Sequence, residues 1–103
     1  MSYPHQKFYE AVACLVSEGP LRKRLAFAAQ YLITLQPTNF TGKDVEHLKA
    51  WEQIRDDLTW ADPDQETEGK VEATTKRMID RDAERCAREI LDVFLRLSGG
   101  LRS

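Results

Sequence analysis

The stretch LAFAAQYLITL, from Leu25 to Leu35, decides the fold of this chain. It carries no charge, and only Gln30 and Thr34 are plainly polar. On a helix its apolar residues would cover three sides, and a helix that is apolar almost all round is one that other elements surround. We therefore expect the central helix of a small bundle. Its most buried residues should include Leu25, Phe27, Ala28, Tyr31, Leu32 and Leu35.

The composition indicates one globular domain, residues 1–103. Hydrophobic residues make up 42% of the chain, charged residues 31%, and the net charge is -2. Such a balance favours neither strong attraction to nucleic acid nor a membrane surface. The apolar run is also shorter than the roughly 20 residues of a membrane span, and no signal-peptide pattern is found. With only Cys14 and Cys86, we expect a protein of the reducing cytoplasm.

Helical periodicity extends through the rest of the chain, and β-strand signals are absent. We predict helices over residues 4–18, 20–36, 42–60 and 68–97. Gly19 and Pro20 indicate a tight junction, and Pro37 should end the second helix. Thr41 and Asp44 resemble a capping box for the third helix. These features predict an all-α, up-and-down bundle of four principal helices.

The last helical region can be read as one helix or two. A break near Asp80, whose side chain could cap a new helix, would give a short helix followed by a long one. The long helix would direct one apolar stripe inward. That stripe comprises Ala83, Cys86, Ala87, Ile90, Phe94 and Leu97.

Two groups of basic side chains in the sequence are expected to need a partner elsewhere in the chain. Arg22, Lys23 and Arg24 crowd the first turn of the second helix, where the helix dipole disfavours cations, so we expect compensation from Glu18 or another acid. Arg55 follows Trp51 by one turn on an apolar face. Its guanidinium should lie along the indole ring or find a carboxylate.

The polar residues give no catalytic, metal-binding or cofactor-binding pattern. The acidic segment 61–69 alternates carboxylates, but a calcium loop counted from Asp64 has Thr75 where the bidentate Glu is required. We interpret it as a solvated loop. His5 and His47 lack companions at ligand spacing, and the two cysteines sit in apolar surroundings where thiols are unreactive.

A basic stripe is the best candidate for a binding surface. Arg81, Arg85 and Arg88 recur at helical spacing and could contact phosphate or an acidic partner. Glu84 and Asp92 precede Arg88 and Arg96 by four residues, however, the favourable order for intrahelical pairs. A helix-turn-helix is excluded, because the second helix is too apolar to lie exposed in a groove of DNA.

Several short fragments resemble a group of small all-helical bacterial proteins of unknown function. The resemblance implies an all-helical fold and a bacterial cytoplasmic setting, and it carries over no activity and no functional residue. The fragments are Leu21-Arg22, Arg24-Leu25, Asp57-Leu58-Thr59, Glu68-Gly69, Glu72-Ala73-Thr74, Arg77-Met78, Ala83, Ala87 and Ile90-Leu91.

These observations predict a small non-catalytic protein-interaction or regulatory module, not an enzyme. The surplus of apolar sides on the second helix suggests self-association as a two-fold homodimer, binding of another protein, or both. The alternative is a nucleic-acid-associated accessory protein that uses the basic stripe. An enzyme with a shallow site would need convergent polar groups that the sequence does not show.

Overall fold

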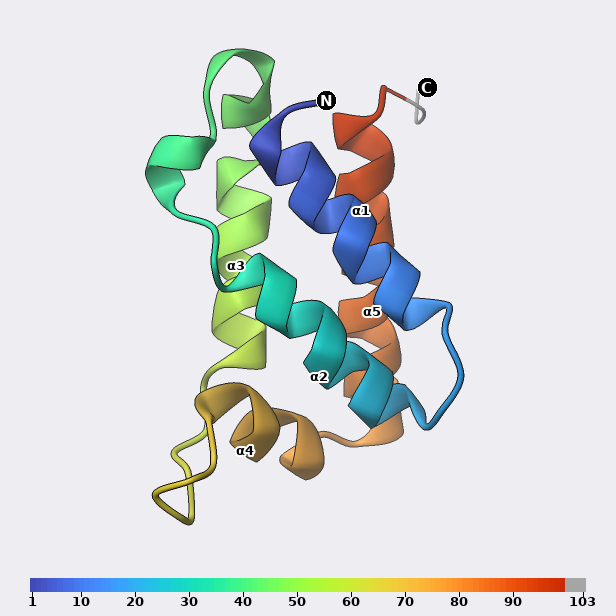
Figure 1. Cartoon of the computed structure of the whole chain (residues 1–103), viewed down its shortest axis with the longest axis vertical. Helices are drawn as coiled ribbons and strands as arrows, with labels where there is room; N and C mark the ends of the chain where they lie inside the picture. Colours follow the sequence, from blue (N-terminus) through green and yellow to red (C-terminus); the bar gives the residue numbers. More distant parts are fainter. Residues whose placement is uncertain (100–103) are drawn as a thin grey trace.

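The computed structural model of the chain describes residues 1–99. Within them the chain forms helices and no strands, as predicted, and Figure 1 shows α1 and α2 in front of α3 and α5, with α4 at one end. The last two of the five α-helices come from the region predicted to be one helix or two. The helices are α1 (Tyr3–Leu15), α2 (Leu21–Leu32), α3 (Leu48–Leu58), α4 (Lys70–Arg77) and α5 (Asp80–Leu97), with short 3-10 helices at Pro37–Asn39 and Gly42–His47.

The core lies between the two layers, and Trp51 is the largest side chain that is fully buried within residues 1–99. Its indole Nε1 donates to the carbonyl of Leu32 at 3.0 Å, and its ring lies 5.2 Å from that of Phe40. The Arg55 guanidinium lies 4.9 Å from the centre of the indole, which confirms the predicted contact. The same core cluster holds buried side chains from all five helices, among them Phe8, Leu25, Ile54, Leu58, Val71 and Ile90.

Helix α2 is not surrounded, and this part of the prediction is wrong. Leu25, Leu32 and the nearby Leu35, which follows the helix, are buried as expected, but Phe27 is 61% exposed and Tyr31 is 36% exposed. The reason is that α2 lies beside α1 in one of the two layers, so that the side of α2 that faces away from the other layer stays in water. The helix also ends at Leu32, four residues before the predicted end.

The chain turns between α1 and α2 at Gly19 and Pro20 as predicted, but α1 ends at Leu15, three residues before the predicted end. Gly19 has a φ of +116°, a backbone conformation that residues other than glycine rarely adopt. Pro20 precedes the first turn of α2. Arg24 reaches back across the turn, donating from one guanidinium nitrogen to the carbonyl of Leu15 at 2.6 Å and from Nε to that of Gly19 at 2.8 Å. A cation of α2 thus stabilises the carboxyl end of α1.

The third helix begins differently from the prediction. Residues 42–47 form a 3-10 helix, and the α-helical geometry starts at Leu48. The expected capping box is absent, because the Thr41 side chain accepts no backbone hydrogen bond. Instead the Asp44 amide donates to the Thr41 carbonyl at 3.0 Å, which is a 3-10 contact.

The break before α5 is confirmed, but Asp80 does not cap it. Met78 and Ile79 adopt extended backbone geometry, and Ile79 holds the N-cap position without a side-chain hydrogen bond. The Asp80 carboxylate turns instead to Arg22, at 2.9 Å. On α5 the predicted inward residues are buried or partly buried, and the buried set is Ala83, Cys86, Ile90 and Val93.

Candidate functional site

The basic stripe lies on the exposed side of α5, as predicted, but its three arginines differ in their partners. The guanidinium of Arg85 is 3.2 Å from Glu89, 3.6 Å from Asp57 and 3.9 Å from Asp82. Arg81 and Arg88 have no ion pair with any residue of 1–99. Arg85 is therefore engaged within the molecule, and the other two are free to bind elsewhere.

Acidic residues interrupt the basic stripe. A shallow hollow of about 270 Å³ on this side of α5 is lined by equal numbers of cationic and acidic residues. The expected intrahelical pairs of Glu84 with Arg88 and of Asp92 with Arg96 are not formed within 4 Å in the described part of the chain. The surface is thus a mosaic of both signs. The lining residues are Arg81, Glu84, Arg85, Arg88, Glu89 and Asp92.

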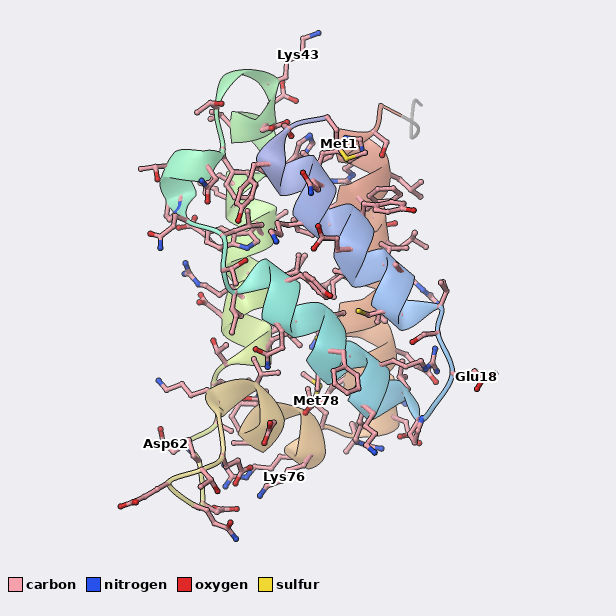
Figure 2. The ribbon with its side chains drawn as sticks, viewed as in Figure 1. Met1, Glu18, Lys43, Asp62, Lys76 and Met78 are labelled. Carbon is pink, nitrogen blue, oxygen red and sulfur yellow. The ribbon has the colours of Figure 1, made fainter. Side chains whose placement is uncertain are left out.

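The basic turn of α2 has a structural role. Arg22 donates to the Met78 carbonyl at 2.8 Å and pairs with Asp80, so it connects α2 to the α4–α5 break. Glu18, one of the acids we considered as compensation, points outward from the α1–α2 turn (Figure 2). Of the three cations in this turn, Lys23 is the one whose side chain makes neither an ion pair nor a hydrogen bond within residues 1–99.

The acidic loop is exposed to solvent over most of its length, as predicted, and its carboxylates also pair with cations at the end of α4. Lys76 lies 2.9 Å from carboxylate oxygens of both Asp64 and Glu68, and Arg77 lies 2.7 Å from Asp64. Figure 2 shows Asp62 and Lys76 together at this end of the molecule. The hydrogen bond from Lys76 and the charge of Arg77 lower the pKa of Asp64. No group of three potential metal ligands gathers here or elsewhere in residues 1–99.

Cys14, Cys86 and Ser98 lie in settings that disfavour nucleophilic reaction. Burial, and then the negative charge of Asp57, raise the pKa of the Cys86 thiol to about 11, and burial raises that of Cys14. A thiol is nucleophilic only as the thiolate, which such a pKa suppresses at neutral pH. The Ser98 hydroxyl lies 2.7 Å from the His5 ring but donates to the Phe94 carbonyl at 2.8 Å.

Three exposed rings on α1 and α2 make up what we call the aromatic face: Tyr3, Phe27 and Tyr31. Their exposed fractions are 47%, 61% and 36%. Lys7 lies between the two tyrosines, its Nζ 5.4 Å from the centre of the Tyr3 ring and 5.5 Å from that of Tyr31. Sequence reasoning assigned Phe27 and Tyr31 to the core. Both residues lie on a different side of the helix from the buried residues of α2. This difference in helical position was the signal that could have identified them as exposed.

A second apolar surface is a groove of about 300 Å³ where α1 meets α2 and α5, which we call the α1–α5 groove. Val16 and Leu91 on its edges are 78% and 41% exposed. One charged residue of each sign stands beside it. Its lining comprises Val12, Leu15, Val16, Leu21, Glu84, Ala87, Arg88 and Leu91.

Comparisons of the chain with protein-family models, with curated proteins and with solved structures found no match. The resemblance to small bacterial helical proteins therefore stays a prediction. Of the helices in residues 1–99, none combines the length and the apolarity that crossing a membrane requires.

Proposed function

We propose that the chain is a non-catalytic protein-interaction module that binds another protein through the aromatic face and also self-associates. The aromatic face carries this proposal. Phe27 and Tyr31 lie one turn apart on the same helix, and Tyr3 joins them from α1 across Lys7.

The physical case rests on the cost of leaving this surface in water. Burial of apolar area is favourable by about 25 cal/mol per Å². Exposed apolar side chains that gather in one place, in contrast to scattered ones, are typical of interaction surfaces. Tyrosine and phenylalanine are enriched in the cores of protein interfaces, where a rigid ring buries a large area with little loss of entropy. The cation between the two tyrosines, Lys7, is already paired with Glu10 at 3.5 Å, so the attraction of this face rests on its rings.

The local chemistry supports a binding role over catalysis. The thiol of Cys86 is protonated at neutral pH, and the Ser98 hydroxyl is committed to a backbone carbonyl. A wide hollow of about 650 Å³ is open and lined by opposed charges from α2, α4 and the acidic loop. Of its three cations, Arg22 and Lys76 already bind carboxylates, and Lys23 has no such partner within residues 1–99. Arg22 and Lys76 therefore have little remaining capacity to stabilise a reacting centre.

Nucleic-acid binding by the basic stripe is the alternative. One observation favours it, namely that Arg81 and Arg88 lack ion-pair partners in the described residues. Glu84 and Asp92 beside them would repel phosphate, and a footprint of two free arginines predicts a shallow dependence of affinity on salt.

The test is a capture experiment with purified protein as bait in cell lysate, with and without nuclease treatment, comparing the wild type with Phe27→Gln. Trp60→Gln is the matched control, because Trp60 is a similarly exposed ring, at 58%, away from the aromatic face. The proposal expects the same protein bound by the wild type and the control and lost with Phe27→Gln. Capture of the same protein by the Phe27→Gln variant, or binding that disappears with nuclease, would contradict the proposal.

A further inference from the structure

The outer side of α5 carries four charges that alternate in sign along one row, which we call the charge row: Glu84, Arg88, Asp92 and Arg96. All four are exposed. Neighbours in the row are four residues apart and opposite in charge, yet none of the four forms an ion pair within residues 1–99. The row is therefore a set of charges whose pairing capacity is unused within residues 1–99.

The row faces away from the core. The buried residues of α5 are Ala83, Cys86, Ile90 and Val93, and at 100° per residue the middle of the charge row lies on the opposite side of the helix. Residues at i and i+4 form one of the ridges by which helices pack, inclined about 26° to the axis. This arrangement is suited to contact with another helix.

We propose that α5 binds α5 of a second copy, antiparallel, about a two-fold axis at the level of Ile90 along the helix. The order of charges along the row is minus, plus, minus, plus, so that the reversed row reads plus, minus, plus, minus. In the antiparallel alignment Arg88 meets Asp92 of the second copy, and Glu84 meets its Arg96. Each contact occurs twice because the interface is isologous. A parallel alignment in register would oppose like charges at every position.

The inclination of the row fixes the packing angle. Two i, i+4 ridges lie along one another when their helices cross at about 50°, the commonest class of helix packing. Arg85 lines the same hollow as the row, but its charge is already paired with Asp57 and Glu89.

Apolar burial supplements the charges. A two-fold axis perpendicular to α5, lying between the two helices, keeps the α1 sides of both copies on one side of the interface. The two α1–α5 grooves therefore meet, and the exposed Leu91 of each copy faces the other. Val16 extends the same apolar surface from α1. Exposed ion pairs alone contribute little, so this shared groove is needed to exclude water from the contact.

This inference rests on the self-association in the proposed function and deepens it. It assigns the second copy to α5, where the pattern of charge is self-complementary. The aromatic face is then left open for a different protein, so a dimer would present two such faces.

Charge reversal tests the alignment. Arg88→Glu places a carboxylate opposite Asp92 of the second copy at both symmetry-related positions, and we expect at least about tenfold weaker dimerisation by analytical ultracentrifugation. Asp92→Arg should do the same by opposing two cations. The double variant Arg88→Glu with Asp92→Arg restores opposite charges and should dimerise again. A mixture of the two single variants should form a heterodimer, although each variant alone dimerises weakly.

Lys23→Glu, which reverses an exposed and unpaired cation on α2, is the control and should dimerise as the wild type does. Circular dichroism checks that each variant folds. If both single variants dimerise as the wild type does, or if the double variant and the mixture fail to restore the dimer, the assignment of the interface to α5 is overturned. Self-association itself would still stand. A wild-type chain that stays monomeric would overturn self-association itself, and binding through the aromatic face would be judged by the capture experiment.

Discussion

The substitution Trp51→Phe tests how much a fully buried core side chain contributes to stability, and the structure allows the loss in free energy of unfolding to be estimated. The indole is fully buried, and its N–H donates to the Leu32 carbonyl at 3.0 Å. Phenylalanine removes that bond, which costs about 0.5–1.5 kcal/mol, and leaves a gap of about two to three methylene-sized groups at about 0.8 kcal/mol each. The carbonyl keeps its second donor, the Leu35 amide at 3.2 Å, which limits the loss. The expected destabilisation is about 2–3 kcal/mol.

Urea unfolding followed by far-ultraviolet circular dichroism measures this change without depending on tryptophan emission. A loss of that size should lower the melting temperature by about 10–20 °C for a domain of this length. Trp60→Phe is the matched control, since Trp60 is 58% exposed, and it should change stability by less than about 0.5 kcal/mol. Equal losses in the two variants, or less than about 1 kcal/mol for Trp51→Phe, would refute the central role of this indole.

Three further predictions concern the polar contacts. Arg24→Met removes two hydrogen bonds to carbonyls at the end of α1 and should destabilise the chain by about 1–2 kcal/mol in urea unfolding, against almost no change for Lys23→Met. Because two cations of α4 hold the pKa of Asp64 below its ordinary value of 3.8, its contribution to stability is complete above that value and is lost as the pH falls toward the folded pKa. Asp64→Asn should therefore flatten the fall in stability below about pH 5, and an unchanged pH profile would count against these ion pairs. Cys86, with a pKa of about 11, should react with a disulfide reagent at about pH 8 only as fast as the chain opens, and later than Cys14; prompt labelling of both thiols would contradict its burial.

The sequence predicted local structure where the physical cause was itself local. The tight turn at Gly19 follows from a glycine that tolerates positive φ next to a proline that begins a helix. The break before α5, and the contact of Arg55 with Trp51, arise between residues close in the chain. Even there the detail could differ, as with Asp80, which pairs with Arg22 instead of capping its own helix.

The candidate surfaces could be predicted only in part. The exposed position of Arg81, Arg85 and Arg88 follows from the period of α5. The period of α5 does not predict which of the three arginines is free, because Asp57, the partner of Arg85, belongs to α3 and meets Arg85 only after the helices pack.

By itself, then, the sequence determined that the chain is helical, where most helices lie and which stripe of each is apolar enough to be buried. Periodicity and turn chemistry fix these features within a few neighbouring residues. Only the tertiary structure decided that α2 lies in one of two layers, with one of its sides facing water. An apolar helix can be buried on one side or on all sides, and the choice depends on how many neighbours the rest of the chain supplies. This packing covers Leu25 and Leu32 and leaves Phe27 and Tyr31 in water.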